Sequence, residues 1–297
     1  MLAMSNTHRL EDLAGRYVFD EKVDGVRAMM LVGPHGFRII NRNGVDRTAR
    51  YPDLAQGAAW INQEAVLDGE IVMLDESLGF EGIARRDKQQ SPAAILKAAT
   101  QTPAKFVAFD VLRVATSALT ALPWHERRKW LDSVMNKAPA NFRTSHWSND
   151  PSIYDKLMSE GKEGVVAKLT WAPYTSGRSG AWLKHKAKYR VTAIVVGYEP
   201  GTGKRRECGK FILALLDDNA TPVRLGVVGS GFTDAELVEY KTRLDNGRMW
   251  LAEIETMGLT DSGALRQPIF KGERTDLSFL DASTTQLETL PKGTTAP

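Results

Sequence analysis

The stretch Lys22-Val23-Asp24-Gly25-Val26-Arg27 decides how the N-terminal part of the chain is interpreted. Strand-like segments flank it, since residues 17–19 precede it and residues 28–32 follow. A lysine held by the backbone beside other cations suits an amine nucleophile, because nearby positive charge favours the uncharged amine. Asp24-Gly25 is also a common hairpin turn, and a hairpin with solvated charges explains the local sequence equally simply. The rest of the chain must decide between the two.

Size and composition are those of an ordinary soluble protein. The 297 residues are enough for two domains, and 42% hydrophobic with 25% charged residues fits a globular chain. No apolar run is long enough to cross a bilayer, and residues 1–16 lack the apolar segment of a secretory signal. The single cysteine, Cys208, excludes a disulfide framework and a four-cysteine zinc site, and we interpret it as a small, half-exposed thiol. We therefore expect a cytoplasmic protein (in the host cytoplasm if viral) with no membrane partner, and the net charge of +3 is compatible with a polyanionic one.

Residues 1–189 mix helix and strand patterns without strict alternation. The periodicity predicts helices over residues 53–65, with Leu54, Ala58 and Ile61 on one face, and over 92–99, from 123 and from 151 to 161. Strand-like runs occupy residues 39–40, 67–74, 106–112, 164–168 and 181–186. This mixture favours an α+β fold of antiparallel sheets flanked by helices.

The pattern changes after Tyr189, where we expect a domain boundary. Short strands are predicted over residues 192–198, 210–216, 223–228 and 251–256, and a capping box at Thr233 and Glu236 opens a single helix. Several short strands and one helix in about a hundred residues suit a small closed barrel such as an OB-fold. The polar tail, residues 283–297, is expected to be frayed.

Four segments of the first part carry candidate chemistry. Asp68-Gly69-Glu70 places carboxylates in an apolar strand, which is either a solvated edge or a site that binds a ribose hydroxyl or orients the lysine. Phe109 belongs either to the core or to a ring surface for a flat base. Glu163 is either a charged loop residue or a magnesium ligand. Lys184, Lys186 and Lys188 would align on one strand face, and an anion between them is favoured over a solvated edge.

Three further segments are less specific. Arg274-Thr275-Asp276 is by itself an ordinary surface turn. Residues 84–88 and 203–206 are basic and loop-like, and they are candidate contacts for a nucleic-acid backbone.

In their order along the chain, these segments resemble the motifs of the ATP-dependent DNA ligases, within the covalent nucleotidyltransferase superfamily. The matching segments are Lys22-Val23-Asp24-Gly25-Val26-Arg27, Arg42-Asn43-Gly44, Asp68-Gly69-Glu70, Phe109-Asp110, Glu163-Gly164-Val165-Val166, Trp182-Leu183-Lys184-His185-Lys186 and Arg274-Thr275-Asp276. The last motif usually continues with a lysine, where this chain has Leu277. The resemblance implies a nucleotidyltransferase domain with ATP-grasp-like antiparallel sheets and flanking helices, residues 1–189, followed by an OB-fold domain, residues 190–297.

The resemblance also implies roles around ATP. Lys22 would attack the α-phosphate and form a lysyl-adenylate, while Lys184 and Lys186 would hold that phosphate. Glu21 would reach the adenine mainly through its backbone, and Phe109 would stack on it. Arg27 and Glu70 would contact the ribose side of the nucleotide.

The remaining implied roles concern metal, leaving group and DNA. Asp24 and Glu163, with Glu70 counted beside them, would bind Mg²⁺ or Mn²⁺. Arg42 would contact the 5′-phosphate at a nick, and Arg274 and Asp276 would orient pyrophosphate when the OB domain closes. AMP would pass from ATP to Lys22 and then to the 5′-phosphate, and the 3′-hydroxyl would displace it and seal nicked double-stranded DNA.

The sequence leaves rivals open. We expect a monomer of the minimal two-domain form. An NAD-dependent ligase resembles a longer protein, with a nicotinamide-binding domain before the lysine and a four-cysteine zinc module after the OB-fold. We exclude that class because 21 residues precede Lys22 and the chain has one cysteine. An mRNA-capping guanylyltransferase and an RNA ligase of the same superfamily remain alternatives. A non-catalytic OB-type nucleic-acid binder is the third.

Overall fold

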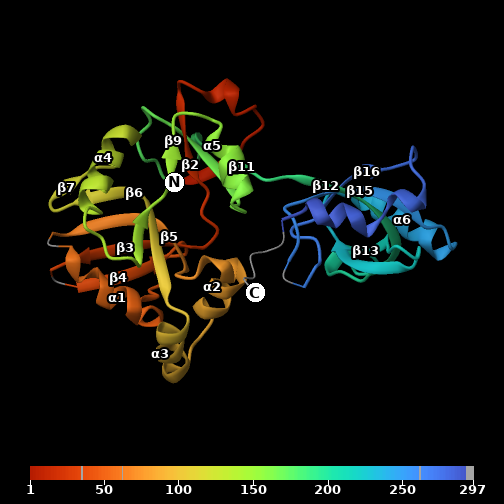
Figure 1. The fold of residues 1–297 in the computed structure, drawn as a ribbon, viewed down its shortest axis with the longest axis horizontal. Coiled ribbons are helices and arrows are strands. Elements are labelled where there is room, and N and C mark those ends of the chain that lie inside the picture. Colours follow the sequence, from red (N-terminus) through yellow and green to blue (C-terminus); the bar gives the residue numbers. More distant parts are fainter. Residues whose placement is uncertain (35, 62, 261, 292–297) are drawn as a thin grey trace. The chain divides into compact units, whose positions relative to one another are not determined.

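The computed structural model describes residues 1–34, 36–61, 63–260 and 262–291, which form two compact units (Figure 1). The first unit is Met1–Lys186, and the second begins at Ala187. Among the helices of these described residues, none has both the length and the apolar character needed to span a membrane. The fold is a mixed arrangement of helices and mainly antiparallel sheets, which confirms the predicted class.

One sheet of the first unit has the strand order β1-β11-β10-β2-β9. Its strands are β1 (Leu2–Ser5), β2 (Tyr17–Glu21), β9 (Trp147–Ser148), β10 (Gly164–Leu169) and β11 (Arg178–Lys186). All its pairings are antiparallel except β1 with β11. Helix α5 (Ile153–Ser159) contributes Leu157 to a small core with Phe19 and Val165.

The other sheet of the first unit has the order β4-β3-β5-β6-β7, with β8 paired in parallel to β6. Its strands are β3 (Val26–Gly33), β4 (Gly36–Asn41), β5 (Ala65–Met73), β6 (Ala104–Val114), β7 (Ser117–Ala118) and β8 (Phe142–Thr144). The helices of this part are α1 (Pro52–Gly57), α2 (Gly79–Asp87), α3 (Pro92–Gln101) and α4 (Trp124–Val134). Met30, Ile39, Leu67 and Phe106 are fully buried in its core.

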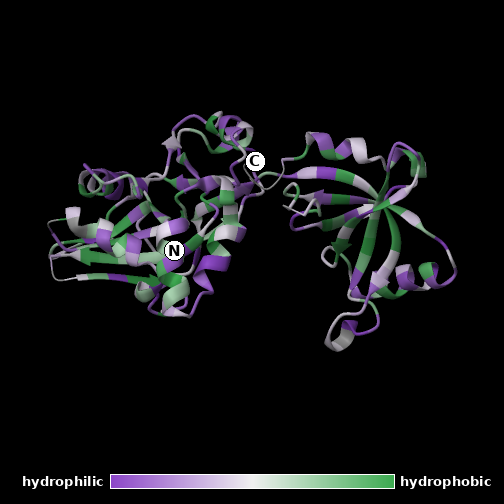
Figure 2. Cartoon of the chain, turned by 60° about the horizontal axis from the view of Figure 1, so that its bottom comes forward, coloured by the Kyte–Doolittle hydropathy of each residue, from purple (hydrophilic) through white to green (hydrophobic). Residues whose placement is uncertain are grey.

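The second unit is built on one antiparallel sheet of order β14-β13-β12-β15-β16. The strands are β12 (Tyr189–Glu199), β13 (Lys210–Leu216), β14 (Pro222–Val228), β15 (Trp250–Thr256) and β16 (Ile269–Glu273), and α6 (Asp234–Asp245) is its helix. The predicted capping box is confirmed, because Thr233 and Glu236 bond each other's backbone at the start of α6. Aromatic rings pack in the core of this unit, and Figure 2 shows apolar residues along the strands of both units.

The structure corrects four local predictions. The helix expected over residues 53–65 ends at Gly57, because a 3-10 turn, Ala58–Trp60, is enough to bury Ala58 before β5 begins. Residues 84–88 are largely helical rather than loop-like, and Arg86 is buried in an ion pair with Asp53.

The other two corrections concern the second unit. Cys208 is buried in the core rather than half-exposed, and this burial raises the pKa of its thiol. The tail is ordered over a 3-10 helix, Thr284–Thr289, because Gln286 exchanges hydrogen bonds with the main chain of Thr192 at 2.9 and 3.1 Å. Residues 292–297 of the predicted frayed tail lie outside the described residues.

Candidate active site

Lys22 lies in a loop that joins the two sheets of the first unit. Strand β2 ends at Glu21 in one sheet and β3 begins at Val26 in the other, so the hairpin alternative is wrong. The backbone N–H of Lys22 donates to Gly164 O at 2.9 Å, which fixes the loop against β10. At Gly25 a Cβ atom would stand 2.4 Å from Ile71 O, so a side chain there would push the loop away from β5.

A cavity of about 640 Å³ opens beside this loop. It brings together eight of the residues that the sequence assigned to the site: Glu21, Lys22, Arg27, Arg42, Glu70, Phe109, Lys184 and Lys186. Arg42 is exposed and the others are at least partly buried. The cavity is therefore built from both sheets, with Lys22 between them.

Glu163 holds two of the lysines together. Lys22 Nζ donates to Glu163 Oε2, and Lys186 Nζ lies 2.8 Å from Oε1. The carboxylate side chain is only 4% exposed. Burial raises the pKa of Glu163, but Lys22 and Lys186 together outweigh it and leave this pKa below its ordinary value. Glu163 is thus an anion shared by two cations.

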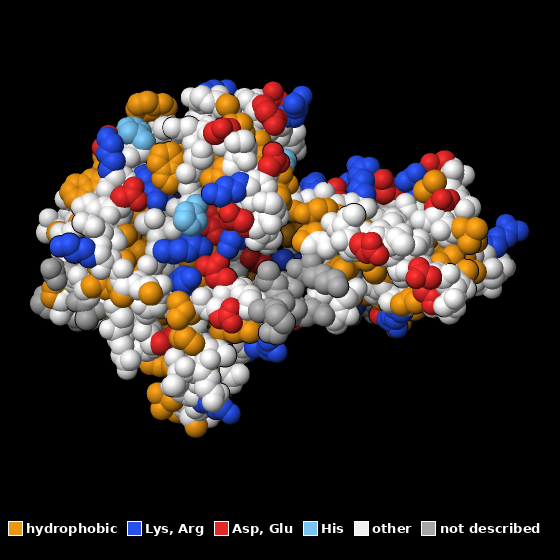
Figure 3. Space-filling model, in the orientation of Figure 1, with side chains coloured by type: hydrophobic (Ala, Val, Ile, Leu, Met, Phe, Trp, Pro, Cys, Tyr) orange, Lys and Arg blue, Asp and Glu red, His pale blue; other side chains and the backbone are white. Residues whose placement is uncertain are grey.

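Lys184 lies in a concentration of positive charge. Its pKa is lowered, first by burial and then by Lys186, Lys22 and Arg178. Strand β11 lies between β1 and β10, so the solvated-edge alternative is wrong. Lys188 lies beyond the end of β11 and pairs with Glu255 at 3.2 Å, so the predicted row of three lysines ends at Lys186. Elsewhere charges are mixed: Figure 3 shows positive and negative side chains interspersed over the visible face of the first unit, unlike the cluster of positive charges around Lys184.

Strand β5 supplies two carboxylates with different environments. It lies between β3 and β6, so it is not a solvated edge. Asp68 accepts from Arg27 Nε and Nη2 at 3.1 and 2.7 Å and from the Tyr174 hydroxyl at 2.7 Å. Glu70 Oε2 is buried without a hydrogen-bond partner, and burial raises the pKa of Glu70 to about 8 despite Lys22 and Arg27. Asp68 therefore positions Arg27, and Glu70 is left to meet a ligand.

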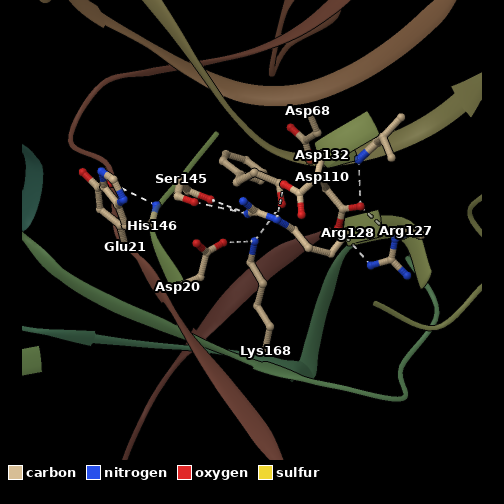
Figure 4. Close-up of polar contacts among 12 residues, drawn as sticks. Asp20, Glu21, Asp68, Asp110, Arg127, Arg128, Asp132, Ser145, His146 and Lys168 are labelled. Atoms are coloured by element: carbon tan, nitrogen blue, oxygen red, sulfur yellow. Dashed lines mark hydrogen bonds and ion pairs between the residues drawn. The ribbon is translucent and has the colours of Figure 1, made fainter. Parts of the chain in front are cut away.

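Phe109 faces the cavity beside residues that the sequence reasoning missed. Its ring meets Trp182 edge-on with centroids 5.8 Å apart, and Lys168 Nζ lies 4.9 Å from the centre of the Phe109 ring. Lys168 is 2% exposed and pairs with Asp20, as Figure 4 shows. The available signal was a charge at the end of the apolar run of β2, Asp20, and a lone charge within the apolar run of β10, Lys168, because two buried ions in such runs require each other.

Several buried polar atoms at the cavity lack partners. Among the described residues, the side-chain atoms Asp20 Oδ1, Arg47 Nε and Glu70 Oε2 are buried without a hydrogen bond, and all three residues line the cavity. Such atoms are costly and rare in folded proteins. The cavity is therefore matched to a polar ligand that would satisfy them.

The three residues predicted to bind a metal do not form a metal site by themselves. Within the described ranges, no three His, Cys, Asp or Glu side chains are grouped as metal ligands. Glu70 lines the cavity, whereas Asp24 and Glu163 are not among the lining residues, although Glu163 contacts Lys22, which is. Magnesium is commonly held by one or two carboxylates together with substrate phosphates, and Glu70 and Glu163 fit that donor set.

Arg274 and Asp276 belong to the second unit. The Arg274 guanidinium forms two hydrogen bonds to the Asp276 carboxylate, at 2.8 and 2.7 Å, just after β16. The pKa of Asp276 is lowered to about 2, mainly by this bond. Leu277 is partly buried against the core of the unit. The leucine therefore adds apolar packing at a position where the family usually has lysine.

A protein-family model described as "ATP dependent DNA ligase domain" matches residues 1–186, the whole of the first unit. The chain belongs to the ATP-dependent DNA ligase family. The ATP dependence of that family agrees with a cavity lined by lysines and by unpartnered polar atoms.

Relatives and solved structures agree with this membership. The chain is 30% identical over 293 residues to the multifunctional non-homologous end joining protein LigD of Pseudomonas aeruginosa, covering 88% of the chain and 34% of that protein. It is 32% identical over 254 residues to a DNA ligase of Pyrobaculum arsenaticum, covering 78% of the chain and 43% of the relative. A solved mycobacterial DNA ligase D complexed with ATP and MES has a TM-score of 0.53 at 25% identity, with 94% and 95% of the two chains covered. The ligase-family chain thus spans about a third to two fifths of these two relatives.

Proposed function

We propose that the chain is an ATP-dependent DNA ligase that seals nicks between a 5′-phosphate and a 3′-hydroxyl in duplex DNA. The observation that carries the proposal is the convergence of Lys22, Lys184 and Lys186 on one cavity that also contains unpartnered polar atoms. Residues 1–189 would be the adenylation domain and residues 190–297 an OB-fold domain. The enzyme would act as a monomer.

In the first step Lys22 Nζ attacks the α-phosphorus of ATP. A nitrogen–phosphorus bond forms, the bond from the α-phosphorus to the bridging oxygen breaks, and pyrophosphate leaves. Glu163 Oε2, which already accepts a hydrogen bond from Nζ, would take the proton that the amine loses as it attacks. Lys184 and Lys186 oppose the negative charge that builds on the phosphate, which is the main task of a protein in phosphoryl-type transfer.

The base and sugar of ATP fit the remaining lining. Phe109 offers its ring to adenine, and Asp20 Oδ1 offers an acceptor suited to the exocyclic amine of that base. Glu70 Oε2 would accept from a ribose hydroxyl, while Arg27 stays oriented by Asp68. Each of these contacts would satisfy an atom or a ring surface that the protein leaves open.

Metal and DNA complete the proposal. Glu163 and Glu70, together with Asp24 two residues after Lys22, would hold Mg²⁺ or Mn²⁺. The metal would neutralise negative charge on the phosphates. Arg42, exposed at the cavity, would bind the 5′-phosphate of the nick. Arg274 and Asp276 would orient pyrophosphate in the first step.

Two comparisons test the function. The protein is incubated with Mg²⁺ and α-labelled ATP or α-labelled GTP, and then with nicked duplex DNA or nicked duplex RNA. A DNA ligase takes label from ATP and seals the DNA. Label from GTP would indicate a capping enzyme, sealing of RNA alone an RNA ligase, and no label a binding protein.

A further inference from the structure

Two dipeptides, Glu21-Lys22 and Lys162-Glu163, lie side by side at the edge of the active site. Lys22, which lines the cavity, contacts Glu163, and the residues before these two in sequence, Glu21 and Lys162, belong to a second group of charges. In that group Arg143 binds Glu21, and Glu76 binds both Arg143 and Lys162. We call Glu21, Arg143, Glu76 and Lys162 the Arg143 clamp.

The clamp ties the two sheets of the first unit to each other. Glu21 ends β2, and Lys162 lies just before β10; both strands belong to the sheet β1-β11-β10-β2-β9. Arg143 lies on β8 and Glu76 follows β5, both from the other sheet. The nucleophile loop, residues 22–25, spans these same two sheets, so the clamp fixes the distance that this loop has to bridge.

The contacts of Arg143 are directional. Its Nη1 and Nη2 donate to Glu21 Oε2 and Oε1 at 2.8 and 3.0 Å, and Nη2 also reaches Glu76 Oε1 at 3.4 Å. Lys162 Nζ donates to Glu76 Oε2 at 2.5 Å, and Lys105 Nζ donates to Oε1 at 3.1 Å. The Glu21 side chain is 2% exposed, so its charge depends on this partner.

Glu21 is held on its backbone side as well. Its N–H donates to His146 O at 2.7 Å, and its Oε2 accepts from the His146 N–H at 3.3 Å, a contact drawn in Figure 4. Burial raises the pKa of Glu21, but Arg143 and Lys162 outweigh it and leave this pKa below the ordinary value. The carboxylate stays ionised at neutral pH and keeps its grip on Arg143.

We propose that Arg143 is a positioning residue for the nucleophile: by holding Glu21 and Glu76 together it keeps Lys22 in register with Glu163 and the phosphate lysines. This inference rests on the proposed adenylation of Lys22. Arg143 itself is not among the residues that line the cavity, so it acts through Glu21 and not by contact with ATP. Loss of the clamp should therefore slow the chemical step far more than it weakens ATP binding.

The test measures the single-turnover rate of lysyl-AMP formation and the ATP dissociation constant separately. Arg143→Gln and Glu21→Gln should each lower the rate by about 10-fold or more and change the dissociation constant by less than about 3-fold. Arg143→Lys should recover only part of the rate, because one ammonium cannot bind two carboxylate oxygens in a fork. The double variant should be no slower than the slower single variant, since both remove one interaction.

Arg113→Gln is the matched control. Arg113 lies on β6 and pairs with Glu64 at 3.1 Å in a half-exposed bridge, so its loss should leave the rate unchanged. If Arg143→Gln fails to fold, Glu21→Gln alone decides the question. Rates within about 2-fold of the wild type in folded Arg143 or Glu21 variants would overturn the inference. A wild-type protein that forms no lysyl-AMP would instead overturn the proposed function.

Discussion

Each unit of the protein contains an arginine that grips a carboxylate with two hydrogen bonds, but the two pairs have opposite surroundings. Arg127 and Asp110 meet at 2.8 and 2.9 Å with side chains 0% and 1% exposed. Arg274 and Asp276 meet at 2.8 and 2.7 Å with side chains 30% and 63% exposed. Two pairs of equal geometry therefore differ in what they can do. The buried Arg127–Asp110 pair is a fixed part of its unit, whereas the exposed Arg274 can exchange Asp276 for an anion from solution.

The contrast extends to the units as wholes. Among the described residues, every buried ionisable side chain with a formal charge lies in the first unit, where Figure 4 shows several of them in contact. In the described part of the second unit the buried polar residues are Thr192 and Thr256, and its core is mainly aliphatic with a group of packed aromatic rings. The first unit thus has charged side chains buried inside its fold, whereas the charged side chains described in the second unit lie at least partly exposed.

The largest expected effect is complete loss of adenylation in Lys22→Ala, because no other described amine is both fixed by Gly164 and held by Glu163 as Lys22 is. Labelled ATP should give no covalent label, while the thermal unfolding curve stays cooperative because Lys186 still pairs with Glu163. Lys188→Ala, outside the cavity, is the control and should keep full labelling. Undiminished labelling of the Lys22 variant would refute the nucleophile assignment.

Arg127→Met should cost the first unit about 3–5 kcal/mol of unfolding free energy, because Asp110 is left buried without its ion partner. Urea or thermal unfolding measures it. Arg224→Met, which removes an exposed pair with Glu199 in the second unit, should shift the unfolding temperature by less than about 2 °C. Equal losses in the two variants would remove the distinction between the units.

Glu70 makes stability depend on pH in a particular direction. Its pKa is about 8 in the folded protein against 4.5 ordinarily, so folding binds a proton between these values and stability falls as pH rises toward 8. Glu70→Gln should abolish this fall, a difference of the order of a few kcal/mol above pH 8. Unfolding temperatures from pH 5 to 9, without ATP or metal, measure it. Glu64→Gln, an exposed control, should follow the wild type, and a Glu70→Gln curve parallel to both would contradict the prediction.

The smallest effect concerns the exposed pair. Arg274→Ala should slow lysyl-AMP formation by roughly 10- to 100-fold, as loss of one charge on the leaving group would, and should leave the unfolding temperature unchanged. Arg224→Ala, which breaks another exposed pair in the second unit, is the control for both measurements. A drop in unfolding temperature without a change in rate would mean that the Arg274 pair is structural.

The sequence predicts what depends on local patterns. Strands β5, β6, β10 and β13 follow from apolar runs, and α6 follows from its capping box. The helix over residues 53–65 was overextended because three buried positions at helical spacing also fit one helical turn followed by a 3-10 turn. Cys208 was misplaced because one residue type in a loop says little about what packs over it.

The candidate site was predicted residue by residue but not contact by contact. Resemblance brought forward Lys22, Glu163 and Lys186, yet their ion pairs join residues far apart in the chain and emerge only from the pairing of β10 with β2 and β11. For the same reason, the sequence does not predict Asp20 and Lys168. Each is a buried charge whose partner lies far away in the chain, and the pair forms only when β2 and β10 are paired.

The proposed chemistry requires that the amine of Lys22 becomes covalently joined to AMP. The most direct measurement is the intact mass of the protein after mixing with ATP and Mg²⁺, followed by mass-spectrometric mapping of the modified peptide. A gain of one AMP, located on Lys22, is the expected result. An unchanged mass, or AMP located on Lys184 or Lys186, would contradict it.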